Sequence, residues 1–144
     1  MENIMSIYNN MPKMMKKLKK DKFENFFNLF EKENLYFFEK FIYEIENSTD
    51  VEKKIEEISG DFVLQVKNTF SNNKGKISGA KQADLNLFMI YYVFPLILKI
   101  DNPNSVLLVE RLCKDWSIYF ANNISYGTYE KIYGSFREKI FGIF

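Results

Sequence analysis

The feature that most constrains the fold is an apolar stretch at about Leu85 to Ile100. Between Leu87 and Leu98 every residue is aliphatic, aromatic, methionine or proline. A helix without a polar face is buried on all sides, and this run falls well short of the ~20 residues that a helix needs to cross a bilayer. The stretch therefore predicts the central, buried helix of a globular fold rather than a membrane segment.

A buried β-strand is the competing interpretation of so short an apolar run. Strands usually extend over about four to eight residues, and the sequence offers no second strand-like run to pair with this one. Length and the missing pairing partner therefore favour a helix. Because Pro95 lacks a backbone N–H and clashes with the preceding turn, we expect a kink or an irregular turn near the C-terminal end of this helix.

Phenylalanine recurs at steps of three and four residues in the first third of the chain, which is the spacing of one helix face. This stripe predicts one long amphipathic helix or two helices in line. It loses phase between Leu18 and Phe23 and contains the polar residue Asn34, so a bend is expected near either point. The apolar members of the stripe are Phe23, Phe26, Phe27, Phe30, Phe37, Phe38, Phe41 and Ile45.

A second apolar stripe follows the polar break at Asn47 to Asp50. Thr49 and Glu52 have the spacing of a capping box, so the helix should begin at one of the last two residues of this break. The stripe runs through Gly60, which a kink or a close helix contact would explain. Polar and glycine residues from Ser71 to Gly79 then indicate a loop. The apolar members of the stripe are Val51, Ile55, Ile58, Phe62, Val66 and Phe70.

Two more helices are expected after the central one. The turn from Asp101 to Asn104 ends the central helix and places Pro103 near the start of the next. Because this connection is short, the next helix should pack antiparallel to the central helix. Thr128 can cap the last helix, and the apolar tail from Phe141 to Phe144 should dock on the core. The residues expected to face inward are Val106, Val109, Leu112, Cys113, Trp116 and Phe120 on the first of these helices, and Tyr129, Ile132, Tyr133, Phe136 and Ile140 on the second.

Together these patterns predict an all-α fold with a single domain over residues 1–144. We expect an orthogonal or bundle-like array of about five to six helices around the central apolar helix at residues 85–100. A chain of 144 residues can bury about 68 to 70% of its unfolded surface, so it needs no disulfide or metal to fold. Residues 1–22 form a basic segment that we expect at the periphery.

The titratable residues exclude most familiar catalytic and metal sites. The sequence contains no histidine and a single cysteine, Cys113. This excludes Ser-His and Cys-His nucleophile pairs, histidine-ligated zinc and any multi-cysteine cluster within the chain. Cys113 shares the apolar stripe of Val109 and Trp116, so we interpret it as a core residue rather than a reactive thiol. No catalytic residue, cofactor or metal is therefore expected.

Charge and cysteine content also bear on compartment and partners. The formal net charge is +1, so no overall field attracts nucleic acid or an anionic membrane to the whole surface. The single cysteine fits a reducing cytoplasm, and Met1 to Tyr8 lack the features of a secretory signal. We therefore expect a cytoplasmic protein without a transmembrane segment.

Two further groups of residues could carry chemistry, and for each the structural interpretation is favoured. The acidic pairs Glu56-Glu57 and Glu44-Glu46 could supply paired carboxylates, but they lie on solvated helix faces beside lysines. The loop from Lys74 to Lys81 faintly resembles a phosphate-binding loop. Its glycine spacing differs from that of a P-loop and no strand precedes it, so a solvated loop is expected.

The strongest local charge feature is a group of six lysines near the N-terminus, where Pro12 suits the first turn of a helix. Such lysines can contact phosphates through charge alone, but no arginine accompanies them to read a guanine edge. The interleaved methionines and Leu18 would also suit an anionic membrane surface or a partner's groove. The plainer interpretation is a solvated face whose apolar residues dock on the protein's own core. The group, called here the lysine cluster, comprises Lys13, Lys16, Lys17, Lys19, Lys20 and Lys22.

A family resemblance covers a little under half of the chain, from about Lys74 to Lys139. Four segments carry it, and they are Met89 to Leu98, Leu112 to Trp116, Tyr129 to Ile132 and Gly134 to Lys139. These segments resemble a family of uncharacterised small helical proteins of low-GC Gram-positive bacteria. The resemblance implies a helical fold and a cytoplasmic bacterial origin, and it implies no activity. In the family a cysteine-containing box often follows the last motif; here Phe141 to Phe144 follow it, so no cysteine-dependent role is expected.

Three classes of function can be weighed on this basis. The leading hypothesis is a non-enzymatic helical interaction module, such as an adaptor, inhibitor or regulatory subunit, whose partner is another protein or a second copy of the chain. A homodimer would cover the abundant apolar surface. The alternative is a protein that binds nucleic acid or an anionic membrane surface through the lysine cluster. An enzyme with an unorthodox site built from tyrosine, lysine and carboxylates ranks last.

Overall fold

The protein is all-α, as the sequence predicts. The computed structural model describes residues 3–120 and 126–142, apart from the side chains of residues 120, 126–130, 132 and 136. No strand occurs in these ranges, and none of their helices is long and apolar enough to cross a membrane. The elements are α1 (Ile4–Asn9), the 3₁₀ turn η1 (Lys13–Lys17), α2 (Lys20–Lys32), α3 (Phe38–Glu46), α4 (Val51–Phe70), α5 (Gly79–Phe88), the π-helical segment η2 (Met89–Val93), α6 (Phe94–Leu98), α7 (Pro103–Phe120) and α8 (Tyr126–Gly142).

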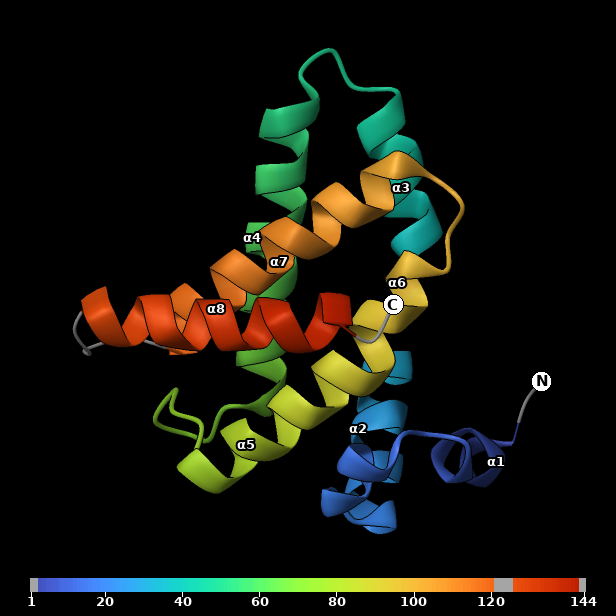
Figure 1. Cartoon of the computed structure of the whole chain (residues 1–144), viewed down its shortest axis with the longest axis vertical. Helices are drawn as coiled ribbons and strands as arrows, with labels where there is room; N and C mark the ends of the chain where they lie inside the picture. The colour runs from blue at the N-terminus through green and yellow to red at the C-terminus, as the bar shows by residue number, and fades with distance from the viewer. Residues whose placement is uncertain (1–2, 121–125, 143–144) are drawn as a thin grey trace.

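The central helix is formed by α5, η2 and α6, which follow one another without a break (Figure 1). It begins at Gly79, where the Ser78 hydroxyl accepts a hydrogen bond from the Lys81 N–H, and not at Leu85 as the apolar pattern predicts. The expected irregularity lies in the turn before Pro95. There the Phe94 N–H donates to the carbonyl five residues back, and the wider π turn gives the proline ring room that a regular turn lacks.

An aromatic cluster joins the central helix to α2. Phe88 is fully buried, and its ring centroid lies 5.4, 5.7 and 5.1 Å from those of Phe23, Phe26 and Phe30. Tyr92, one turn further along, lies 5.3 Å from Phe88. Tilted and edge-on rings at these distances add to the hydrophobic stabilisation of the core. The buried residues of the central helix are Leu85, Phe88, Met89, Ile90, Tyr91, Val93, Phe94 and Ile97.

The phenylalanine stripe is divided between α2 and α3, so a single long helix is wrong and the bend expected at Asn34 is confirmed. Asn34 has φ 56°, a left-handed conformation that asparagine tolerates better than most residues. Its N–H donates to the Glu31 carbonyl and the Leu35 N–H donates to the Phe30 carbonyl. These bonds form a Schellman motif, in which the buried Leu35 and Phe30 supply the usual apolar contact.

The two longest helices, α4 and α7, pack against each other, crossing obliquely with the same chain direction (Figure 1). Ser59 donates to Asp115 Oδ2 at 2.7 Å, and one turn before it Arg111 lies 4.0 Å from Glu56. The Trp116 indole donates to Asn86 near the start of the central helix at 2.8 Å. The end of α7 therefore lies beside the first half of the central helix, while a short turn joins the opposite ends of the two helices, so their expected antiparallel arrangement is confirmed.

Several local predictions about α4 need correction. Asp50 caps the helix by accepting a hydrogen bond from the Lys53 N–H at 3.1 Å, so the capping box at Thr49 and Glu52 is wrong. The helix continues through Gly60, and a Cβ atom there would meet nothing within 4 Å. The close helix contact proposed to explain this glycine is therefore wrong.

The predicted burial pattern holds for most but not all of the inward positions. Three predicted inward residues are exposed. Val51 and Val106 are 37% and 48% exposed because each lies in the first turn of its helix. Phe37 is 50% exposed because it lies before the first turn of α3. The last helix begins at Tyr126, so Thr128 lies inside it and does not cap it. Ile140 is buried and Tyr133 and Phe141 are partly buried, whereas Phe120, Tyr129, Ile132, Phe136 and residues 143–144 lie outside the described part.

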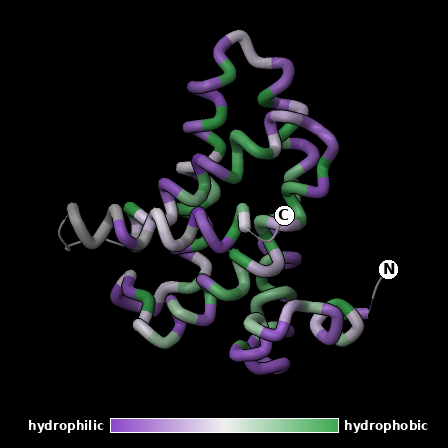
Figure 2. Tube along the Cα trace, in the orientation of Figure 1, coloured by the Kyte–Doolittle hydropathy of each residue, from purple (hydrophilic) through white to green (hydrophobic). Residues whose placement is uncertain are grey.

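The N-terminal segment contains one helix that the apolar pattern does not predict, α1. Asn3 caps it by accepting from the Met5 N–H, and the buried Tyr8 donates its hydroxyl to the Leu18 carbonyl. The helix expected after Pro12 is the 3₁₀ turn η1. Figure 2 shows hydrophilic residues gathered around η1 and the first turn of α2, and the alternation along α4 and α7 that marks helices with one buried face.

Candidate functional site

The lysine cluster is spread over η1, the two-residue link after it and the first turn of α2. All six lysines are exposed. Met15 and Leu18 between them, and Phe23 directly after them, are fully buried. The backbone that carries the lysines is therefore held on the core while their charged ends remain in water. The cluster therefore belongs to a packed surface of the protein.

The structure does not arrange the six lysines as one uniform patch. Lys22 forms an ion pair with Asp84, with 3.3 Å between Nζ and Oδ2, and Lys16 donates to the Asn9 carbonyl at 3.2 Å. Lys22 lies in a hollow beside α2 that Lys81 and the same Asp84 also line. Lys17 lines a different groove. Two members of the cluster thus line separate hollows, and only the hollow beside Lys22 contains a carboxylate among its described residues.

The groove beside Lys17 combines lysines with apolar residues, and we call it the lysine-rimmed groove. It has a volume of about 480 Å³ and lies between η1, the central helix and α8. Ile90 and Tyr91 are buried in its floor, whereas Met14 at its edge is 46% exposed. The groove is lined by Met14, Lys17, Ala83, Asn86, Leu87, Ile90, Tyr91, Lys131, Ser135 and Lys139.

Helical spacing explains which side chains meet in this groove. Lys131, Ser135 and Lys139 follow one another at steps of four residues, which places them on one face of α8. The residues from the central helix, between Ala83 and Tyr91, follow steps of three and four and also share a face. In the groove, a basic face of α8 therefore lies opposite a mainly apolar face of the central helix.

A polar cluster on α7 and α8 fixes this orientation of α8. The Arg137 Nε lies 2.8 and 3.0 Å from the two carboxylate oxygens of Glu110, and the Tyr133 hydroxyl donates to the same carboxylate. Desolvation, with the hydrogen bond to Glu110, raises the pKa of Tyr133 to about 12. Because Tyr133 and Arg137 hold one face of α8 against α7, the face with Lys131 and Lys139 is turned to the groove.

Charge in the lysine-rimmed groove has one sign. Three lysines line it, and no carboxylate does among the residues that the structure describes there. The whole chain has 20 basic and 19 acidic residues, so the groove concentrates positive charge that the composition as a whole does not show. Charges of one sign around an apolar cleft focus the electrostatic potential and attract a ligand of the opposite sign.

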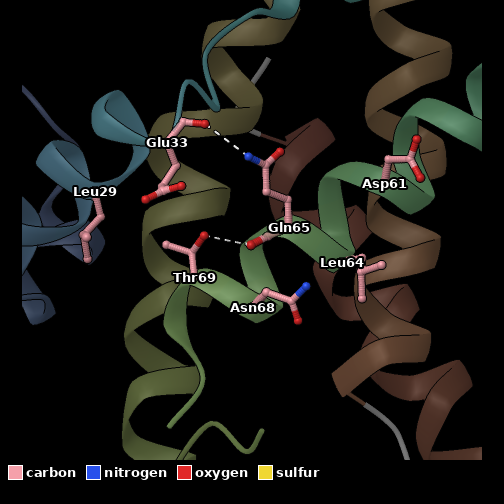
Figure 3. A pocket seen from close by; sticks show the side chains of 7 residues that line it. All are labelled: Leu29, Glu33, Asp61, Leu64, Gln65, Asn68 and Thr69. Atoms are coloured by element: carbon pink, nitrogen blue, oxygen red, sulfur yellow. Dashed lines mark hydrogen bonds between the residues drawn. The ribbon is translucent and has the colours of Figure 1, made fainter. Parts of the chain in front are cut away.

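A shallow pocket between the end of α2 and α4 has an acidic lining, but it lacks paired carboxylates. Figure 3 shows the carboxyl groups of Glu33 and Asp61 apart, on either side of Gln65. The Gln65 amide donates to the Glu33 carbonyl at 3.1 Å, and the Thr69 hydroxyl donates to the Gln65 carbonyl at 2.8 Å. Both bonds end on backbone carbonyl groups, so they hold the pocket wall without involving either carboxylate.

The structure places Glu46, the pair Glu56-Glu57 and the glycine loop at the surface, whereas Glu44 is half-buried. Glu56 and Glu57 are exposed, at 4.0 Å from Arg111 and Lys54 respectively. In the loop the Asn72 side chain accepts hydrogen bonds from the backbone N–H groups of Lys74 and Lys76. Because the loop's own asparagine occupies these amides, they are not directed outward as in a phosphate cradle.

Cys113 is buried, so its interpretation as a core residue is confirmed. Burial, and secondarily the charge of Glu110, raises the pKa of its thiol to about 12. The thiolate is the nucleophilic form of cysteine, and it is scarcely formed here near neutral pH. In the described residues, no group of three or more acidic or cysteine side chains is placed to hold a metal ion.

Sequence reasoning found Lys17 but missed the other residues of the groove. The spacing of Lys131, Ser135 and Lys139 was a readable signal of a basic face. The apolar face from Ala83 to Tyr91 was concealed, because the surrounding sequence is apolar on every side. A scan against protein-family models and searches of curated proteins and of solved structures found no match to this chain.

Proposed function

We propose that this protein is a non-enzymatic helical interaction module, an adaptor, inhibitor or regulatory subunit, that binds a protein partner in the lysine-rimmed groove. The observation that carries the proposal is the groove itself. Its apolar floor and polar rim have the anatomy of a protein–protein interface. The half-exposed Met14 at its edge is flexible and polarisable, as suits a surface that adapts to a partner. The single, buried thiol of Cys113 agrees with action in a reducing cytoplasm.

Site-specific photocrosslinking in the native host tests this proposal. A benzophenone amino acid replaces Ala83, which is exposed in the groove, and in a matched control it replaces Glu52, which is exposed on α4. We expect a protein adduct from position 83 and none from position 52. An adduct with a second copy of the chain would identify a homodimer as the complex. No adduct, or equal adducts at both positions, would overturn the proposal.

Reconstitution with the captured protein then tests the site directly. Ala83→Trp fills the groove without disturbing a buried residue, and Glu52→Trp places the same side chain on an exposed surface elsewhere. The purified partner should bind the wild type and the Glu52 variant with equal affinity, and the Ala83 variant at least about tenfold more weakly. Equal binding by all three proteins would place the interface elsewhere.

A second candidate function is the binding of nucleic acid or an anionic membrane surface through the lysine cluster, because all six of its lysines are exposed. Such binding depends on counterion release, so affinity should fall steeply as salt rises. The test replaces the six lysines with glutamine and measures binding to an oligonucleotide and to anionic vesicles at low salt. Unchanged affinity would remove this candidate.

A further inference from the structure

The lysine-rimmed groove also indicates what kind of protein segment it accepts. Building on the proposed function, we infer that the partner docks an acidic amphipathic α-helix, with its apolar stripe on the groove floor and its carboxylates on the lysine rim. Charge, backbone chemistry and the openness of the groove each carry one step of this inference.

The charge of the partner follows from the rim. Lys17 comes from η1 and Lys131 and Lys139 come from α8, so positive charge stands on both sides of the apolar floor. None of the described lining residues is a carboxylate, so the described part of the groove wall is basic. A basic segment would be repelled, and a neutral one would leave three ammonium groups uncompensated. Carboxylates that flank an apolar stripe complement both features.

The remaining polar groups of the groove are suited to the same partner. The Asn86 side-chain oxygen accepts the hydrogen bond of the Trp116 indole at 2.8 Å. Because an indole N–H can only donate, this bond fixes the orientation of the amide and leaves its NH₂ group as a donor. Ser135 adds a hydroxyl on the facing side. Lysines, an amide NH₂ and a hydroxyl are all able to donate to a carboxylate.

Backbone chemistry favours a helix over an extended peptide. An extended segment binds well where it can add to the edge of a sheet, and residues 3–120 and 126–142 contain no strand. A helix satisfies its own backbone groups and can lay one face between two helices. The groove is bounded by helical elements on every described side, so it offers the ridges against which another helix packs.

The shape of the groove favours a protein segment over a small molecule. Small-molecule sites enclose about 70 to 90% of the ligand surface. This groove is open to solvent, and Met14 at its apolar edge is 46% exposed. A partner that covers the rim as well as the floor would bury that edge, which a small amphiphile held on the floor alone would not.

A display selection with the full-length chain as bait tests the inference. The probe is a library of peptides of about 18 residues, long enough to form helices, with randomised positions in all faces. We expect enriched peptides to combine apolar residues at steps of three and four with aspartate or glutamate beside the stripe. Enrichment of neutral, basic or proline-interrupted peptides would overturn the inference.

Matched charge variants test the role of the rim. Lys17→Glu, Lys131→Glu and Lys139→Glu are combined in one protein, and a control combines Lys53→Glu, Lys74→Glu and Lys76→Glu, which have the same effect on net charge at exposed positions outside the groove. Exposed ion pairs are individually weak, but reversing three should lower the affinity of an enriched peptide by about tenfold or more. The control should change it by less than about twofold.

A charge-swapped peptide, with lysine in place of its acidic residues, should recover affinity for the groove variant. Equal losses in both triple variants, or no recovery, would overturn the inference, as would equal competition by anionic vesicles or an oligonucleotide. Circular dichroism checks that each variant is folded, and glutamine versions replace any that is not.

If crosslinking at Ala83 captures a partner while selection yields no acidic helix, this inference fails and the proposed function stands. If no adduct forms, the proposed function fails.

Discussion

Two glycines in this chain should respond in opposite directions to the same substitution. Gly60 is exposed in the interior of α4, and a Cβ atom there would meet nothing within 4 Å. Gly75 has similar open space, but its φ is +71°, in the left-handed region. Gly60→Ala should therefore stabilise the protein, because alanine restricts the unfolded chain and suits a helix. Gly75→Ala should destabilise it, because alanine is strained where φ is positive.

The size of both effects can be estimated from the backbone alone. Alanine in place of an exposed glycine inside a helix contributes about 0.5 to 1 kcal/mol to the free energy of unfolding. The left-handed conformation costs alanine about 1 to 2 kcal/mol, of which about 0.4 to 1 kcal/mol is offset by the restricted unfolded chain. For 144 residues the unfolding entropy is about 0.3 kcal/mol/K, so each 1 kcal/mol shifts Tm by about 3 °C.

Thermal and urea unfolding, followed by far-ultraviolet circular dichroism, measure both variants against the wild type. Gly60→Ala should raise Tm by about 2 to 3 °C, and Gly75→Ala should lower it by a similar amount. Both variants add the same methyl group, so a general effect of alanine would shift both Tm values in the same direction. A lower Tm for Gly60→Ala would refute the open surroundings of α4 and restore the close helix contact that the sequence suggests. A higher Tm for Gly75→Ala would refute the left-handed turn.

Three further predictions concern the core. Phe88→Ala should cost about 3 to 5 kcal/mol in urea unfolding, because it leaves a cavity among four rings, whereas Phe37→Ala, half exposed, should change stability by less than about 0.5 kcal/mol. Asp115→Ala should cost about 1 to 3 kcal/mol in the same assay, because the fully buried Ser59 hydroxyl loses its acceptor. Burial raises the pKa of the Cys113 thiol from near 9 to about 12. The protonated thiol therefore makes its full contribution to the free energy of unfolding below pH 9, and this contribution is lost as the pH rises towards 12. The difference in unfolding free energy between the wild type and Cys113→Ala should therefore shift against the wild type over that range.

The central helix shows what a single sequence can specify about this fold. Its apolar stretch excludes a solvated helix and a bilayer span, and both conclusions depend only on length and polarity. Its true start at Gly79 lies outside that stretch, because Ser78 and the residues after it form a polar first turn that caps the helix without entering the core. Pro95 alone predicts an irregularity here, but both a kink and an irregular turn fit that prediction, so the sequence does not specify the π turn.

The first third of the chain shows the same limit in a different way. The phenylalanine stripe has the same helical periodicity before and after Asn34, so periodicity alone allows either one helix or two. The left-handed conformation of Asn34 becomes favourable because Leu35 and Phe30 are both buried by the rest of the protein. Burial of Tyr8 against Leu18 likewise holds α1 in place. Contacts between segments determine these elements, whereas short-range patterns determine α4 and α7.

The candidate site could be predicted only where one segment carries it. The lysine cluster is contiguous, so its charge is visible in the sequence. The groove is formed by η1, the central helix and α8. These segments are far apart in the sequence, so no local pattern predicts that they are in contact. The division of the cluster, with Lys22 paired to Asp84 and Lys17 in the groove, depends on the position of α5 beside α2. That position follows from the packing of Phe88 on the rings of α2.

The central helix therefore has two roles, in the core and in the groove, and its uniformly apolar sequence does not distinguish them. Phe88, Val93 and Ile97 are buried in the core, whereas Leu87 is only partly buried and lies in the groove. A helix that is apolar on every side is most stable when every side is covered. The chain covers most of this helix with its own residues and leaves Ala83 exposed and Leu87 partly exposed beneath the lysine rim, beside the buried Ile90 and Tyr91. An apolar stripe from a partner helix would complete that cover, so the feature that organises the fold also provides the floor of the proposed binding site.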